Sequence, residues 1–258
     1  MPTTAGFPGL LRSEWTKLRS VRSYRWTFLA LVGCSLAIGA LVSALEASHW
    51  AHASAAARAN FDPTNWTLAG LAFGQLAVGA LGALAMSSEH STGTITGSLA
   101  AVPHRSRLLA AKATVVGGVV LVAGEALTFM LFAIGQAILA ANHAPHVSLG
   151  QPGVLRAVAL SGAFLALLSL FGLGIGTVVR HSAGAVTLYV GLVLVLPLIL
   201  FPFHVARFAP ETLLSSSVGA VRPAAQALPP GWVGFGLMAL YAAGALALGT
   251  VAFVRRDA

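Results

Sequence analysis

Six long apolar stretches constrain the fold of this chain more than any other feature of its sequence. They cover residues 26–45, 67–86, 113–140, 154–179, 183–203 and 232–254. Each reaches the length of about 20 residues that a helix needs to cross the hydrocarbon core of a bilayer. None alternates polar with apolar residues as the strands of a membrane barrel do. Outside a barrel, a segment that spans the membrane must satisfy its backbone hydrogen bonds within itself, which a helix does. The sequence therefore predicts an all-α, polytopic membrane protein with six transmembrane helices.

The composition leaves no room for a water-soluble domain. Charged residues make up 9% of the 258-residue chain, whereas soluble domains carry about 25%. The segments between the spans, such as residues 87–112, are too short to bury a core of their own. We therefore expect residues 1–258 to form a single transmembrane domain, so that any reaction chemistry belongs inside the membrane or to a partner.

The Lys and Arg residues are distributed unevenly between the two sides of the predicted membrane domain. Eleven of the 15 lie before the first span, in the connections after the second and fourth spans, or after the sixth span. Cytoplasmic loops carry the excess of Lys and Arg, so this set predicts cytoplasmic N- and C-termini. Because the net charge of +8 is spread over several helix ends and does not form one patch, we expect no nucleic-acid partner.

Residues 1–25 precede the first span and carry an amphipathic pattern. Leu11, Trp15 and Leu18 fall within one arc of a helical projection, which favours a helix that lies in the membrane interface and contacts lipid. The alternative is a basic flank without defined structure that only sets the orientation. The small residues 42–44 would also fit a signal peptide, but the polar region before the span is longer than usual, so we expect the span to be retained.

The segment over residues 204–231, between the fifth and sixth spans, is semi-apolar and interrupted by prolines and serines. Pro197 and Pro202 lack a backbone donor, so they should kink or end the fifth span just before this segment. The segment is too short and broken to cross the membrane, which predicts short extracytoplasmic or re-entrant helices.

Glycines spaced four residues apart occur in two of the predicted spans, at Gly70 and Gly74 and at Gly172 and Gly176. This spacing lets the backbones of two helices approach each other closely. It favours packing within the six-helix bundle, and a dimer interface is the alternative.

Glu125 is the one acidic residue well inside a span. An ionisable group at that depth is costly and usually faces the interior of the bundle or a cavity, so Glu125 is a candidate for the substrate pathway. The alternative is a protonated carboxyl that bonds to a neighbouring helix through Gln75 or Gln136.

The usual motifs for nucleotide binding and hydrolysis are missing from the sequence. It contains no Gly-x-x-x-x-Gly-Lys-Ser/Thr loop, no Gly-x-Ser-x-Gly and no His-Glu-x-x-His. Glu46, His49 and His52 have a spacing that could suit a metal, but ligands on flexible loops lack the fixed geometry that metal binding needs. We therefore predict no catalytic residue, no bound cofactor and no metal site in this chain.

The connection over residues 87–112 is the segment richest in candidate functional residues. Ile95, Leu99 and Val102 recur at helical spacing, which predicts a short helix with one apolar side. An apolar side implies docking, either against the chain's own helix ends or in the groove of a partner.

Four segments of the sequence carry a family pattern. Residues 13–20 read Ser-Glu-Trp-Thr-Lys-Leu-Arg-Ser, and residues 89–95 contain Glu-x-x-x-Gly-Thr-Ile. Residues 100–112 follow, and the last segment is Arg255, Arg256 and Asp257. In this order along six spans, the segments resemble the ABC-2 type transporter permease family, the membrane subunits of drug-resistance-like bacterial exporters. The resemblance extends over nearly the whole chain.

The resemblance implies a permease that couples to a separate ABC ATPase, which would hold ATP and Mg. Residues 13–25 would be the interfacial elbow helix, and residues 89–102 the coupling helix that sits in a groove of the ATPase. Arg180 and His181 would make a second, smaller contact. The implied elbow residues are Glu14, Trp15, Lys17, Leu18 and Arg19. The implied coupling residues are Glu89, Gly93, Thr94, Ile95, Leu99, Val102, Arg105 and Arg107.

The resemblance also implies an assembly and a location. Two permease subunits, as a homodimer or heterodimer in the bacterial plasma membrane, would line the pathway, and residues 210–230 would form the re-entrant outer segment. A different class stays open at this point. The chain could be a stand-alone integral membrane protein, either an ion-coupled transporter or a membrane assembly anchor, which needs no ATPase.

Overall fold

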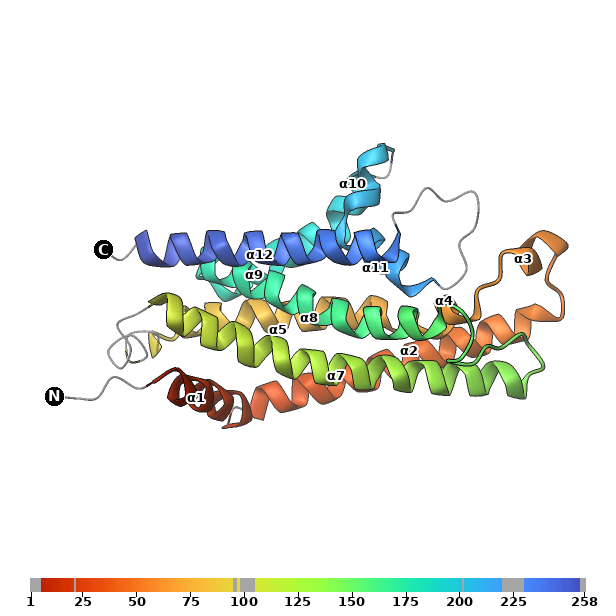
Figure 1. Cartoon of the computed structure of the whole chain (residues 1–258), viewed down its shortest axis with the longest axis horizontal. Coiled ribbons are helices and arrows are strands. Elements are labelled where there is room, and N and C mark those ends of the chain that lie inside the picture. The colour runs from red at the N-terminus through yellow and green to blue at the C-terminus, as the bar shows by residue number, and fades with distance from the viewer. Residues whose placement is uncertain are drawn as a thin grey trace.

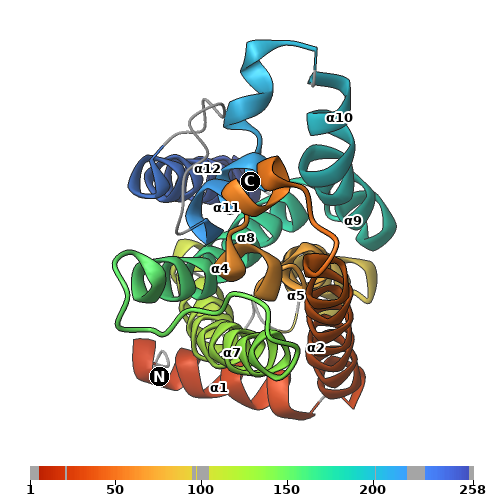
Figure 2. The same ribbon diagram turned by 90° about the vertical axis from the view of Figure 1, so that its right-hand side faces the viewer.

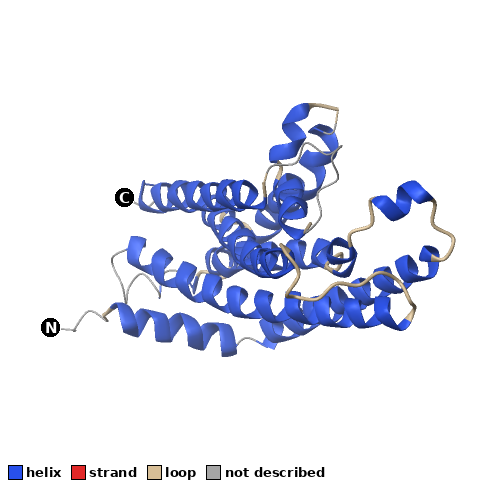
Figure 3. Cartoon of the chain, turned by 45° about the vertical axis from the view of Figure 1, so that its right-hand side comes forward, coloured by secondary structure: helices blue, strands red, loops and turns tan. Residues whose placement is uncertain are grey.

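A computed structural model describes residues 6–20, 22–94, 97, 105–200, 202–219 and 230–255. These residues form helices and connecting loops and contain no strand (Figure 3). The predicted all-α fold class is therefore confirmed for the part of the chain that the structure describes.

Six helical segments are long and apolar enough to cross a membrane, and each coincides with a stretch predicted from the sequence. They are α2 (Arg22–Trp50), α5 (Leu71–Ser91), α7 (Arg105–Ala141), α8 (Val154–Val179), the run α9–η1–α10 (Ser182–Leu200) and α12 (Gly231–Arg255). The helices α2, α5 and α7 extend past the predicted spans, because backbone hydrogen bonding continues into polar residues that apolar patterning does not count.

The helix α8 forms the centre of the bundle. α5, α7 and α12 all pack directly against it (Figure 2). Of its apolar stretch, 72% is buried inside the protein, against 22% for α2 and α12. A helix that is apolar on every side and surrounded by other helices is the core element of such a bundle.

Glycines allow α5 and α8 to touch backbone to backbone. A Cβ atom at Gly172 would collide with the carbonyl of Gly79, and one at Gly176 with the carbonyl of Ala83. In the opposite direction, a Cβ atom at Gly82 would collide with the carbonyl of Ser169. The glycine pair predicted in the fourth span therefore packs within the bundle, as favoured from the sequence.

The helix α1 (Phe7–Ser20) lies across one end of the bundle, transverse to the long helices, and packs on α7 and α2 (Figure 2). Leu10 and Glu14 form its buried side, with Leu10 against Ala111 of α7. Trp15 of α1 is 46% exposed. The chain thus enters α2 from a helix that is already docked, and α1 lies at the same end as Arg255, the last residue of α12 (Figure 1).

The fifth span is irregular where the sequence predicts a kink. α9 (Ser182–Val190) continues as a π-helix, η1 (Gly191–Val195), and then as α10 (Leu196–Leu200). Pro197 lies just after the π-helix, and its missing N–H removes a hydrogen bond from the preceding turn. α10 leans away from the rest of the bundle (Figure 1).

Short helices occupy the connections at the end of the bundle opposite α1. The 3-10 helix η2 (His204–Phe208) and α11 (Pro210–Val218) follow the fifth span, which fits the predicted short helices, and residues 220–229 lie outside the described part. The connection between α2 and α5 also lies at this end (Figure 1). It contains two short helices, α3 (Ala55–Ala59) and α4 (Pro63–Thr67), and Asp62 accepts hydrogen bonds from the backbone at the start of α4.

Candidate functional site

Four charged side chains meet at the end of the bundle that carries α1. We call Glu14 and Lys17 of α1, Glu89 near the end of α5, and Lys112 near the start of α7 the four-charge cluster. Lys112 Nζ donates hydrogen bonds to Glu14 Oε2 at 2.6 Å and to Glu89 Oε1 at 2.7 Å. Lys17 Nζ donates to Glu14 Oε1 at 2.7 Å and to Glu89 Oε1 at 3.1 Å. The cluster therefore ties together three helices that are distant in the sequence.

Most of the four-charge cluster is buried. The side chains of Glu14, Lys112 and Glu89 are 4%, 5% and 12% exposed, whereas that of Lys17 is 39% exposed. Burying a charge is costly unless it is paired and hydrogen-bonded, and here two carboxylates balance two ammonium groups. Burial opposes the charged form of Lys17, but hydrogen bonds and charge attraction from Glu14 and Glu89 outweigh it and raise the pKa of this lysine.

Two buried polar atoms beside the cluster have spare hydrogen-bonding capacity. Glu89 Oε1 accepts from both lysines, while Glu89 Oε2 is buried and has no hydrogen-bond partner within the described residues. His90 Nε2 is also buried without a partner among them. Buried polar atoms are normally satisfied, so both atoms are able to bond to water or to a docked partner.

Further contacts tie the two ends of the 92–104 connection to neighbouring helices. Ser91 Oγ lies 3.2 Å from Ser182 Oγ at the start of α9. Arg105 donates from its guanidinium to the carbonyl oxygen of Phe253 in α12 at 2.9 Å. The ring of His90 meets the ring of Phe253 edge-on, with centroids 5.8 Å apart. The connection is therefore anchored on both sides to the last turns of the bundle.

The structure places some of the predicted coupling residues and leaves others undescribed. α5 ends at Ser91, and Gly93 takes a left-handed backbone with φ of +72°, which suits glycine after a helix end. Thr94 and Arg107 are exposed at the same end of the bundle. The coupling residues Ile95, Leu99 and Val102, and the family-pattern residues Arg256 and Asp257, lie outside the described residues.

The cluster joins residues that the sequence assigned to two separate units. Glu14 and Lys17 were predicted in the elbow helix and Glu89 in the coupling segment, and the structure brings all three together. Lys112 was counted only as a basic loop residue. A partial signal was present, because Lys17 and Lys112 are the only lysines in the chain and Lys17 lies three residues after Glu14.

Glu125 lies on α7 where this helix crosses α8. Its side chain packs so close to Gly162 that a Cβ atom there would come within 2.7 Å of Glu125 Cδ. Of the two glutamine partners considered from the sequence, Gln136 bonds elsewhere, and Gln75 Oε1 is buried with no hydrogen-bond partner within the described residues. Gln136 donates to the Pro63 carbonyl at 3.3 Å and accepts from the backbone of Val147 at 2.8 Å.

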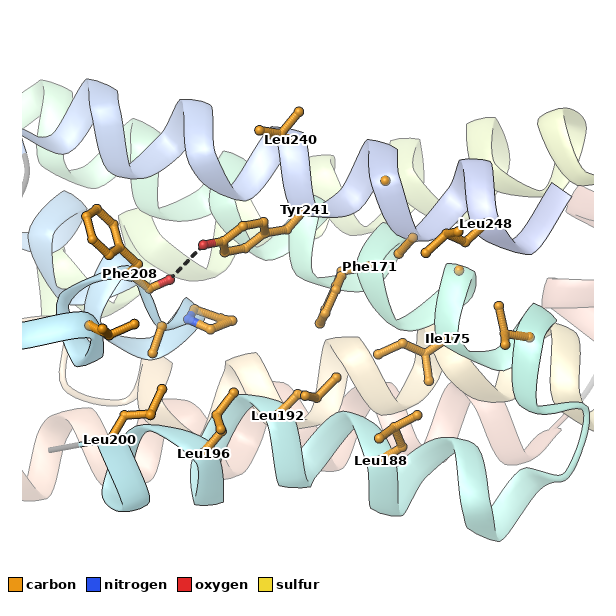
Figure 4. A pocket seen from close by; sticks show the side chains of 17 residues that line it. Phe171, Ile175, Leu188, Leu192, Leu196, Leu200, Phe208, Leu240, Tyr241 and Leu248 are labelled. Atoms are coloured by element: carbon orange, nitrogen blue, oxygen red, sulfur yellow. Dashed lines mark hydrogen bonds between the residues drawn. The ribbon is translucent and has the colours of Figure 1, made fainter. Parts of the chain in front are cut away.

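An apolar cleft opens on the other side of the central helix (Figure 4). It has a volume of about 630 Å³ and lies between α8, the fifth span, α12 and the outer helices η2 and α11. Phe171, Ile175, Leu192 and Tyr241 are among its walls, and none of the described residues that line it is charged. The Tyr241 hydroxyl donates to the carbonyl of Phe208 at 3.1 Å. The volume is in the range of ligand pockets, about 300–1,000 Å³.

Six apolar helical segments, with α8 at their centre, define a multi-pass helical membrane protein. Comparison of the chain with models of known protein families gave no match, and comparison with curated proteins gave none either. Within the described residues, no three His, Cys, Asp or Glu side chains are grouped so that they could hold a metal ion. A particular function is therefore inferred from the residues of this chain.

Proposed function

We propose that this chain is the permease subunit of an ATP-driven ABC exporter of the ABC-2 type. In this proposal the end that carries α1 and the four-charge cluster faces the cytoplasm, and α1 is the interfacial elbow helix. A separate ATPase subunit docks on the connection between α5 and α7. The four-charge cluster is the observation that supports the proposal best, because it links the elbow helix to both ends of that connection.

The cluster suits the transmission of force. Breaking a buried, hydrogen-bonded ion pair by removing one partner costs about 3–5 kcal/mol. Coupling energies between sites in allosteric proteins are about 1–3 kcal/mol. A push of that size on the connection is therefore too weak to pull the cluster apart, so α1, α5 and α7 would move together.

The glycine contacts extend this path to the centre of the bundle. α5 meets α8 backbone to backbone at Gly82, Gly172 and Gly176, where no flexible side chain lies between the two helices to absorb a displacement. Closure of the ATPase pair would then shift a two-state bundle between inward and outward openings.

The apolar cleft suits the transport of an uncharged, apolar molecule. The walls that the described residues form carry no charge, and the π-helix η1 forms part of one side through Leu192. π-helical segments often mark functional positions in helices. In the single chain only 22% of the apolar stretch of α2, and of that of α12, is buried. A second permease subunit would cover part of this apolar surface. Glu125 is kept as a pathway candidate in this proposal, although it is not among the described residues that line this cleft.

Co-purification of an ATPase tests the proposal. The tagged chain is purified from its native membranes as wild type, as Leu99→Asp in the predicted coupling segment, and as Leu149→Asp in the connection at the opposite end. We expect an ATPase in equal amount with the wild type and with Leu149→Asp, and none with Leu99→Asp. Retention of the ATPase by Leu99→Asp would contradict docking at this connection. A transporting chain that purifies alone would favour a stand-alone membrane protein.

A further inference from the structure

A second cavity lies between α1 and the long helices, separate from the apolar cleft of Figure 4. Its volume is about 350 Å³. Its walls come from four elements, α1, α2, α5 and α7. The residues that line the cavity are Trp15, Leu18, Arg19, Phe28, Leu29, Leu81, Ala85, Val116, Val119 and Val120. Among the described residues that line it, every one except Arg19 is apolar, so this part of the cavity is a hydrocarbon-like groove with one cation.

Arg19 carries an unbalanced positive charge at this groove. It is exposed in the last turn of α1, and within the described residues it forms no ion pair. The acidic residues that the structure describes at this end are Glu14 and Glu89, and both are bonded to lysines in the four-charge cluster. An anion at Arg19 would therefore meet no competing carboxylate.

The groove also lies where a lipid can reach it. Leu29, on its α2 wall, is 60% exposed, and Trp15 on the α1 wall is 46% exposed. Tryptophan concentrates at the boundary between headgroups and hydrocarbon, and basic residues near that boundary attract anionic lipids. The groove thus places a positive charge beside an apolar surface, which complements an amphiphile that has an anionic headgroup and an apolar chain.

We propose that this groove binds an anionic membrane phospholipid, with one acyl chain between α1 and α7 and the phosphate at Arg19. The lipid would bridge α1 to α2, α5 and α7 and would hold α1 in its docked position. This inference depends on the membrane setting of the helices and not on the exporter proposal.

The test is native mass spectrometry of the detergent-purified full chain, titrated with phosphatidylglycerol or phosphatidylcholine of the same acyl chains. We expect one phosphatidylglycerol per chain, bound more tightly than phosphatidylcholine. Arg19→Gln should weaken phosphatidylglycerol binding about fivefold, the effect of one basic residue at an anionic surface, and remove the preference. Arg12→Gln is the matched control, because Arg12 is exposed on the same helix but does not line the groove, and it should leave binding within about twofold on the same scale.

A groove-filling variant gives an independent readout. Val119 lines the groove and is half-buried, so Val119→Phe should reduce binding of both lipids while the chain keeps its helical circular dichroism and elutes as one species. If that variant fails to fold, the Arg19→Gln and Arg12→Gln pair decides alone. Equal binding of the two lipids, or unchanged phosphatidylglycerol binding by Arg19→Gln, overturns the proposal. Tighter binding of oleate than of phosphatidylglycerol also overturns it, because the occupant would then be a single-chain anion.

Discussion

Replacing Lys112 with methionine should release α1 from the bundle. The side chain is 5% exposed and donates two short hydrogen bonds, to Glu14 at 2.6 Å and to Glu89 at 2.7 Å. Lys112→Met keeps the length and the apolar part of the side chain but leaves two carboxylates facing each other with only Lys17 between them.

The magnitude follows from burial. Removing one partner from a buried ion pair costs about 3–5 kcal/mol, because the remaining charges stay desolvated. The main apolar anchor of α1 is Leu10 on Ala111, and burying one leucine contributes about 1.5–3 kcal/mol. The loss at Lys112 is therefore as large as the apolar anchor or larger, so α1 should undock before the long helices separate.

Hydrogen exchange of the α1 amides, measured by mass spectrometry in detergent, reports this undocking. A loss of 3–5 kcal/mol lowers protection by about two to four orders of magnitude. Lys17→Met is the matched control, since Lys17 contacts the same two carboxylates but is 39% exposed. An exposed pair contributes up to about 1 kcal/mol, so the control should lower protection by about fivefold. Equal effects of the two variants, or unchanged protection in Lys112→Met, would refute the assignment of Lys112 as the buried centre of the cluster.

Four other outcomes follow from the same structure. Gly82→Val should abolish monodisperse elution from size-exclusion chromatography, whereas Gly118→Val, where a new side chain meets nothing within 4 Å, should elute like the wild type. Tyr189→Phe removes a buried hydrogen bond of 2.7 Å to a backbone carbonyl, and a loss of about 1 kcal/mol should lower the melting temperature by about 2–4 °C in a fluorescence melt. The pKa of Lys17 is raised above its ordinary value of 10.5, so its contribution to α1 docking should be complete below pH 10.5 and lost as the pH rises through the raised pKa. Trp15 fluorescence in a single-tryptophan variant would follow the undocking of α1. Undocking at neutral pH would contradict the prediction. Glu125→Gln should change export without changing expression, and unchanged flux or resistance would remove Glu125 from the pathway.

The spans were predictable because one local property determines them. A helix in lipid needs about 20 apolar residues in a row, and that requirement is readable from each stretch without knowledge of its neighbours. The irregular fifth span was also foreseeable, since Pro197 removes a donor wherever the helix packs. The short helix α4 was missed although its signal was local, with Asp62 as the N-cap and Pro63 as the first helical residue.

The four-charge cluster could not be predicted in the same way. Glu14 and Lys112 are 98 residues apart in the chain. From the helical pattern alone, a charged residue such as Glu14 is expected to face solvent. Its burial is favourable only because α7 supplies an ammonium group at that point. The cavity beneath α1 has the same origin, because its walls come from four elements that meet only in the folded bundle.

The central claim is that this chain works with a separate ATPase that docks on the connection after α5. The most direct measurement is ATP hydrolysis by the material that elutes with the tagged chain after purification from its native membranes. Our account predicts hydrolysis that co-elutes with the wild-type chain, with one ATPase per permease, and is lost with Leu99→Asp. A chain that elutes without hydrolysis, while cells that express it still carry out its transport, would contradict the account.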